Sequence, residues 1–180
     1  KNTPTAVTAA ISVSTGLHQI LSAACATRSF ILPGATTFHP AGIRSLTLGQ
    51  PLRLTYVGRV AESEKRAGDL VPLCKRLASL GVRFELKIVG GGNFLTSLES
   101  SLRHEISSGI VSIWGPQPHT RIREIFQQSD ISLLLSSTEG FPLAVLEGMT
   151  QGCVPFCTRV GDVQTIVQDH VTGKLFNVGD

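Results

Sequence analysis

Several features that mark specialised protein classes are missing from the sequence. No apolar run is long enough to cross a membrane, because the apolar stretch at 6–26 is interrupted by Ser12, Ser14, Thr15, His18 and Gln19. That stretch also lacks the charged start and the cleavage site of a signal peptide. Charged residues make up only 16% of the chain, the net charge is +3, and the basic residues are scattered. This pattern argues against a nucleic-acid partner.

Metal-binding and dinucleotide-binding patterns are missing as well. No zinc spacing occurs among the four cysteines or the histidines that we considered as ligands, which are Cys25, Cys74, Cys153, Cys157, His104, His119 and His170. We therefore expect no metal site, and we expect the cysteines to be buried, reduced thiols, as in a cytosolic protein. The run Gly90-Gly91-Gly92 is not a Gly-x-Gly-x-x-Gly motif. It predicts a tight turn, with the edge of a ligand cleft as the alternative.

From residue 52 onward the sequence alternates regularly between strand-like and helix-like patterns. Short apolar or alternating segments predict strands at 52–57, 83–89, 110–114, 131–135, 154–157 and 174–176. Apolar residues at helical spacing predict helices at 69–80, 95–106, 120–128, 143–151 and 163–168. Strands that alternate with helices predict an α/β fold, a three-layer, doubly wound parallel sheet of the Rossmann-like kind.

The strand order of such a sheet locates a ligand site. If the order is 3-2-1-4-5-6, it reverses between the strands at 52–57 and 131–135. Ligands bind at that reversal, beyond the carboxyl ends of the two strands. The loops that leave these ends are 58–65 and 136–142, so we expect the functional residues there.

Two carboxylates and a proline lie in and after the second of these loops. Pro142 suits the first helical position, because its missing N–H is not needed there. The first N–H groups of the helix have no intrahelical partner and lie at its positive end, so they can hold a diphosphate. Glu147 leans back toward that end, and it suits ribose hydroxyls better than phosphate. From spacing alone, the alternative is that Glu139 caps the helix and Glu147 is solvated.

The spacing of Glu139 and Glu147 resembles the E-x7-E signature of retaining glycosyltransferases that have the GT-B fold and use nucleotide sugars. Further family landmarks occur in the right order over roughly residues 50–180: Val57-Gly58-Arg59 with Lys65, residues 88–92, residues 111–115, residues 152–155, Val160-Gly161, and residues 171–173 with Gly179-Asp180. The chain departs from the family where Gly91 replaces an aspartate, where Pro142 replaces the usual glycine, and at 33–37.

The resemblance implies a role for each matching residue. Arg59 and Lys65 contact the diphosphate, and Glu139 faces the donor sugar; these three form the catalytic set. Cations suit this task because the departing phosphate gains negative charge. The donor-binding residues implied are Gly58, Gly115, Gly140, Phe141, Pro142, Leu143 and Glu147. No metal and no cofactor is implied, since the nucleotide-diphosphate sugar is a co-substrate.

Alternatives remain for three of the side chains near these motifs. Arg59 or Lys65 alone can form a surface ion pair, and Arg66 can substitute for Lys65. Trp114, before Gly115 at a strand end, is more typical of a core residue than of a platform that stacks on a nucleobase.

The resemblance also divides the chain. Residues 1–48, with a strand at 6–13, a helix at 17–26 and an extended run at 30–33, are expected to be a remnant of the acceptor-side domain plus a linker. Residues 49–180 are expected to be the nucleotide-sugar-binding domain, truncated at its C-terminus. The family moves a sugar from a UDP or GDP sugar to an acceptor hydroxyl on a glycan, lipid or small molecule.

Two expectations and two alternatives follow from this function. Residues 1–180 alone should have no transferase activity, because acceptor-side residues are missing. We expect a cytoplasmic protein, and the resemblance allows peripheral contact with the cytoplasmic face of a membrane. The alternatives are another nucleotide-sugar or sugar-phosphate enzyme on the same scaffold, and a catalytically silent nucleotide-binding domain.

Overall fold

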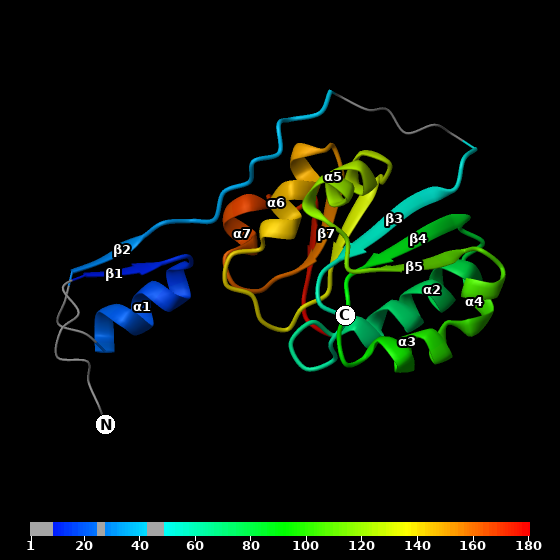
Figure 1. Ribbon diagram of the computed structural model, residues 1–180, viewed down its shortest axis with the longest axis horizontal. Helices are drawn as coiled ribbons and strands as arrows, with labels where there is room; N and C mark the ends of the chain where they lie inside the picture. Colours follow the sequence, from blue (N-terminus) through cyan, green and yellow to red (C-terminus); the bar gives the residue numbers. More distant parts are fainter. Residues whose placement is uncertain (1–8, 25–27, 43–48) are drawn as a thin grey trace.

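A computed structural model describes residues 9–24, 28–42 and 49–180. Figure 1 shows a small unit near the N-terminus, an extended connecting segment and a larger α/β domain. Cys25, the start of the strand predicted at 6–13 and the end of the helix predicted at 17–26 lie outside the described residues.

The larger domain is built on six parallel strands. They are β3 (Leu52–Val57), β4 (Phe84–Val89), β5 (Val111–Gly115), β6 (Ile131–Leu134), β7 (Val154–Thr158) and β8 (Lys174–Phe176). Their order in the sheet is β5-β4-β3-β6-β7-β8, and every neighbouring pair is parallel. Numbered within this domain, that order is 3-2-1-4-5-6. The predicted fold class and the predicted reversal between the first and fourth strands are therefore confirmed.

Helices cover the two faces of this sheet (Figure 1). One group is α2 (Leu70–Ser79), which follows a short 3-10 turn at Ala67–Asp69, with α3 (Leu95–Ser101) and α4 (Arg103–Ser107). The other group is α5 (His119–Gln127), α6 (Leu143–Thr150) and α7 (Val163–Ile166). Between the first group and the sheet lies a cluster of buried side chains that includes Leu70, Leu86, Ile88 and Leu98.

The single helix predicted at 95–106 is wrong, because the chain bends at Leu102. Leu102 has φ −106° and ψ 17°, outside the helical region, and its side chain is fully buried. The hydrogen bonds from Leu102 N–H to Leu98 O and from Ile106 N–H to Leu102 O continue across the bend at 2.9 Å each. The break is therefore a kink within a hydrogen-bonded path, and no glycine or proline marks it in the sequence.

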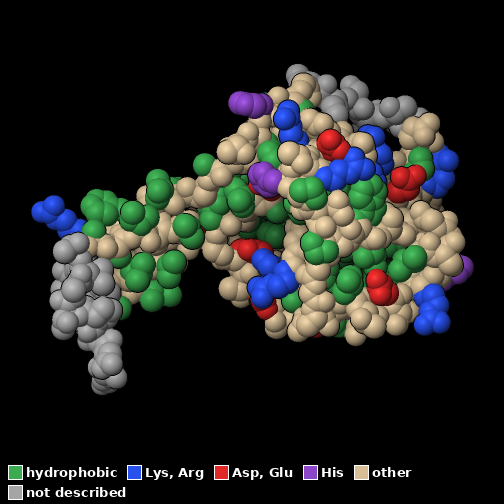
Figure 2. Space-filling view, in the orientation of Figure 1, with side chains coloured by type: hydrophobic (Ala, Val, Ile, Leu, Met, Phe, Trp, Pro, Cys, Tyr) green, Lys and Arg blue, Asp and Glu red, His purple; other side chains and the backbone are tan. Residues whose placement is uncertain are grey.

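The N-terminal unit consists of two parallel strands, β1 (Ala9–Ser12) and β2 (Arg28–Ile31), joined by helix α1 (Thr15–Ala24). No residue of α1 is buried, and large apolar side chains such as Ile20 and Phe30 are mostly exposed. Figure 2 shows hydrophobic side chains spread over this unit. Two strands and one helix are too few to enclose a core. Its assignment to an acceptor-side domain stays a prediction.

The segment that follows β2 is fastened to helix α6 of the larger domain. The side-chain amide of Gln151 donates a hydrogen bond to His39 O at 2.9 Å, and Ala41 N–H donates to Thr150 O at 2.8 Å. Phe38 is buried in a cluster with Phe126 and Cys153. These contacts place the segment beside the C-terminal end of α6.

Cys74, Cys153 and Cys157 are buried, as predicted. Burial raises the pKa of Cys74 and of Cys157 to about 12, because the thiolate would be poorly solvated there. Within the described ranges, the helices are too short or too polar to span a membrane.

Asp169 anchors the last strand, and its ionisation should contribute to stability. Its carboxylate accepts hydrogen bonds from Leu175 N–H at 2.9 Å and from the Arg159 guanidinium at 2.8 Å, and these donors lower its pKa to about 2. A carboxyl group with a lowered folded-state pKa stabilises the fold above its unfolded pKa of about 3.9. That contribution is lost as the pH falls toward about 2.

We therefore expect Asp169→Asn to lower the unfolding temperature at pH 7 and to make little difference near pH 2. Unfolding temperatures of both proteins between pH 2 and pH 7 test this, with the exposed Glu99→Gln as the matched control. A difference between wild type and Asp169→Asn that stays constant over this pH range would contradict the proposed cause.

Candidate functional site

A cavity of about 280 Å³ lies beyond the carboxyl ends of β3, β4 and β5. Its walls come from the ends of three strands and from α5: Val57, Gly58 and Arg59, then Val89, Gly90 and Gly91, then Pro116 and Gln117, and Ile122. Of the residues predicted to bind the ligand, Gly58 and Arg59 line it directly. Gly115 adjoins it, since Gly115 O accepts a hydrogen bond from Gly90 N–H at 2.9 Å.

The glycine run after β4 lets two loops approach closely. A Cβ atom on Gly90 would lie 1.9 Å from Gly58 O, and one on Gly92 would lie 2.1 Å from Val60 O. Val60 N–H donates to Gly91 O at 2.9 Å, which locks the loops together. The run therefore forms the predicted tight turn and also contributes to the wall of the cavity. Any side chain at Gly90 or Gly92 would push the loop after β3 away.

Lys65 and Glu139 meet in a largely buried ion pair. Lys65 Nζ lies 2.5 Å from Glu139 Oε1, and the two side chains are 21% and 10% exposed. Ser136 Oγ donates to the same carboxylate oxygen at 2.6 Å. The loops that leave β3 and β6 thus bring together the residues that the sequence analysis placed there. The alternative that Glu139 caps helix α6 is wrong, since its carboxylate bonds to Lys65 and Ser136, and no side-chain cap is found for that helix among the described residues.

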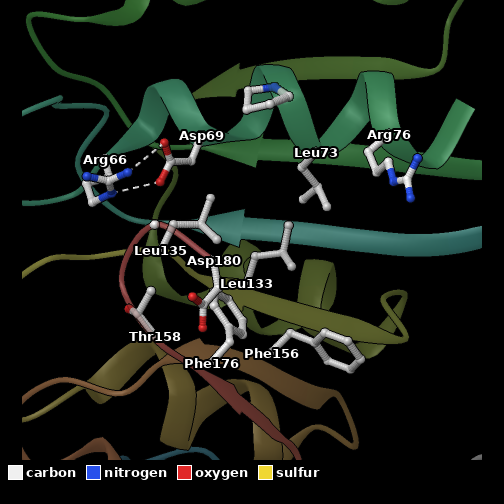
Figure 3. Close-up of a pocket in the computed structure, with 12 residues that line it drawn as sticks. Arg66, Asp69, Leu73, Arg76, Leu133, Leu135, Phe156, Thr158, Phe176 and Asp180 are labelled. Carbon is white, nitrogen blue, oxygen red and sulfur yellow. Dashed lines mark hydrogen bonds and ion pairs between the residues drawn. The ribbon is translucent and has the colours of Figure 1, made fainter. Parts of the chain in front are cut away.

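Arg66 does not take the place of Lys65. Its guanidinium pairs with Asp69 at 2.7 and 3.1 Å, and it lines a different cavity of about 480 Å³ between α2 and the sheet. Figure 3 shows this pair at one end of that cavity, with Leu73, Leu133 and Phe156 among the apolar residues around it. None of the predicted site residues lines this cavity, so we do not assign the site to it.

Arg59 is exposed and forms an ion pair with Glu64. This is the surface pair that the sequence analysis left open, although Arg59 also lines the smaller cavity. Exposed ion pairs contribute only about 0–1 kcal/mol, so a ligand that carries phosphate can displace Glu64. The backbone of Arg59 is fixed by Tyr56, whose buried hydroxyl donates to Arg59 O at 2.8 Å. Burial raises the pKa of Tyr56 above its usual value, so the hydroxyl stays protonated.

Helix α6 begins at Leu143, as the predicted range 143–151 has it, but Pro142 is not its first helical residue. Pro142 precedes the helix, with φ −82° and ψ 75°, and Leu143 is the first helical residue. Proline is tolerated here for the same reason as at the first position, namely that no N–H is required. Leu143 N–H donates to Phe141 O at 3.0 Å, and Val145 N–H donates to Pro142 O at 3.0 Å. Fewer N–H groups are therefore free at this helix end than the sequence analysis expected.

The turn after β7 supports the loop that holds Glu139. Gly161 has φ +49°, and a Cβ atom there would lie 2.1 Å from Glu139 O and 3.0 Å from Gly140 O. Asp162 N–H donates to Gly140 O at 3.2 Å. The Asp162 carboxylate accepts a hydrogen bond from Thr15 N–H at 2.8 Å, which connects this turn to helix α1. Gly161 is thus needed for the close approach of two backbone segments.

Glu147 is only 5% exposed, so the alternative of a solvated Glu147 is wrong. Its Oε1 lies 2.7 Å from Nε2 of His119, the first residue of α5. The Phe38 ring lies on His119, with the ring centroids 4.5 Å apart. The sequence pattern did not predict this side-chain contact. A single histidine 28 residues before Glu147 carries no spacing signal that would reveal it.

Trp114 lines neither of the two cavities. Its indole N–H donates to Ser112 Oγ at 2.9 Å, and Lys87 Nζ and the Arg121 guanidinium lie 5.5 and 5.2 Å from the ring centroid. These are cation–π contacts at the β5 edge of the sheet. Elsewhere in the described ranges, no three His, Cys, Asp or Glu side chains are grouped to hold a metal ion.

Comparison with known proteins points to one family. The family model of glycosyl transferases group 1 matches residues 44–180. The amylovoran biosynthesis glycosyltransferase AmsK of Erwinia amylovora is 30% identical over 139 residues, which cover 74% of this chain and 34% of AmsK.

Solved structures share the fold. Sucrose-phosphate synthase of Thermosynechococcus elongatus superposes with a TM-score of 0.77 at 20% identity, covering 96% of this chain and 46% of the synthase. HepE of Anabaena, in complex with UDP and glucose, superposes with a TM-score of 0.75 at 15% identity, covering 97% of this chain and 50% of HepE.

The extent of these matches differs between this chain and its relatives. The chain spans about a third of the length of the curated relatives it matches. The family model, by contrast, covers most of the chain, including all six strands of the larger sheet. This chain belongs to the glycosyl transferases group 1 family.

Proposed function

We propose that residues 49–180 bind the nucleotide-diphosphate sugar donor of a retaining glycosyltransferase, which moves the sugar to an acceptor hydroxyl. One observation carries the proposal: Lys65 and Glu139, from the loops after β3 and β6, form a largely buried pair where the strand order reverses. In doubly wound sheets this is the place where ligands bind. The solved neighbour HepE, in complex with UDP and glucose, supports a uridine or related nucleotide.

The charges of the site suit the bond that would break. When the bond between the anomeric carbon and the diphosphate oxygen breaks, its electron pair leaves with the phosphate. Arg59 and Lys65 are both cations of the loop after β3, and they would stabilise that charge. Glu139 is paired with Lys65, so a phosphate bound to Lys65 would lie beside Glu139. The sugar attached to that phosphate would then be the group that Glu139 faces.

The rest of the donor would lie along the same edge of the sheet, beyond the carboxyl ends of the strands. Glu147, buried one turn into α6, would accept hydrogen bonds from ribose hydroxyls. The backbone at Gly58, at Gly115 and at 140–143 would support the phosphates, the base and the sugar. Because Leu143 N–H already bonds to Phe141 O, a diphosphate at this helix end would have to displace that hydrogen bond.

The first test is a thermal-shift panel with UDP, GDP, ADP and CMP on wild type and Glu147→Ala. A ligand at about 100 times its dissociation constant stabilises the folded chain by about 2.7 kcal/mol, which raises the unfolding temperature by several degrees. We expect one nucleoside diphosphate to do so with wild type and to lose most of the effect with Glu147→Ala. The exposed Glu99→Ala is the matched control. The absence of a shift with any of the four would count against the proposal.

Lys65→Ala should separate phosphate recognition from nucleoside recognition. A hydrogen bond to a charged group is worth about 1.5–3 kcal/mol, so we expect UDP or GDP to bind about 10- to 100-fold more weakly. Binding of uridine or guanosine, which lack phosphate, should change little. Calorimetric titration measures both, and Arg66→Ala is the control because Arg66 pairs with Asp69 instead. Equal losses for nucleoside and nucleotide would show that Lys65 acts only on the fold.

A further inference from the structure

The carboxylate of Glu147 has one fixed oxygen and one open oxygen. His119 Nε2 lies 2.7 Å from Oε1, and because an ionised carboxylate only accepts, Nε2 is the donor. In the part of the chain that the structure describes, no second hydrogen bond reaches the carboxylate. Oε2 is therefore the atom that remains for a ligand.

His119 lies close in sequence to residues that line the smaller cavity. It is the first residue of α5, and its side chain is 52% exposed. Gln117, two residues earlier, and Ile122, one helical turn later on the same face, both line the cavity. His119 is not itself a lining residue, but it lies on the stretch of chain between two residues that are.

The segment that follows β2 packs against the imidazole of His119. The ring of Phe38, which is 8% exposed, lies 4.5 Å from the His119 ring at a tilt of 40°. The backbone next to Phe38 is fixed on α6 by the hydrogen bond from the Gln151 side chain to His39 O. Phe38 therefore cannot move without disturbing a contact to the helix that carries Glu147.

We propose that His119 is a positioning residue that fixes Glu147 so that Oε2 points to the ribose hydroxyls, with Phe38 holding the imidazole in place. This rests on the proposed function. A glutamate side chain has several rotamers, and fixing one before the ligand arrives lowers the entropy lost on binding. A residue that bonds to the far side of a ligand-binding group commonly orients it. The predicted effect is therefore on the recognition of the ribose, rather than on nucleotide binding as a whole.

The experiment compares UDP and GDP with their 2′,3′-dideoxy counterparts by calorimetric titration. For wild type we expect the ribonucleotide to bind roughly tenfold or more tightly, since a hydrogen bond to a charged group is lost in the dideoxy form. His119→Ala should reduce this ratio about three- to tenfold. His119→Gln, which keeps an N–H donor, should retain most of the ratio. His104→Ala, at an exposed histidine on α4, is the control.

The outcomes separate this inference from the function on which it rests. If wild type binds neither ribonucleotide, or binds ribo and dideoxy forms equally, the donor-site proposal fails and the inference fails with it. If wild type prefers the ribonucleotide and His119→Ala keeps the same ratio, only the positioning role is overturned. Should His119→Ala unfold, His119→Leu carries the test, because leucine fills the space against Phe38 without offering a donor.

Discussion

The register between β3 and β6 depends on Asp130, the residue before β6. Its carboxylate accepts hydrogen bonds from Arg53 N–H at 2.9 Å and from the Arg53 guanidinium at 2.6 and 3.0 Å. Asp130 N–H donates to Arg53 O at 2.7 Å, and Asp130 O accepts from Val154 N–H at 2.8 Å. Asp130 is 8% exposed, so one buried residue holds the starts of three strands: its carboxylate and backbone N–H bond to Arg53 of β3, and its backbone carbonyl bonds to Val154 of β7. A slip by one residue would turn every side chain to the opposite face.

Because the register of β3 and β6 is fixed, the positions at which their following loops begin are fixed as well. The loop after β6 meets the loop after β3 through Ser137 N–H to Glu64 O at 2.9 Å and through the pair of Lys65 with Glu139. Buried carboxylates need partners, and both carboxylates of the site have one, Lys65 for Glu139 and His119 for Glu147. A diphosphate that draws on Lys65 would leave Glu139 with Ser136, so ligand binding and the local charge balance are linked.

The sequence predicted the strands and their order well, because short apolar strands alternate with amphipathic helices and little else fits that pattern. It predicted Pro142 at the first helical position, whereas Pro142 is the residue before α6. Proline suits both positions, because neither requires an N–H. The sequence could not predict the kink at Leu102, where no glycine or proline occurs. Burial of Glu147 has a signal in hindsight, because the helix around it is apolar, but its partner His119 has none. That contact exists only once the sheet has brought α5 beside α6.

The N-terminal unit and the segment that follows β2 each contact residues that support the site. Phe38 and the backbone around it lie on His119 and on the end of α6. Thr15, at the start of α1, donates to Asp162, whose own N–H holds Gly140 beside Glu139. One contact bears on the carboxylate proposed for the ribose and the other on the loop proposed for the sugar. A displacement of residues 9–24 or 28–42 relative to the sheet would therefore disturb the support of the Glu139 loop or that of Glu147. These residues would therefore contribute to the geometry of the site, in addition to forming the N-terminal unit and its connection to the domain.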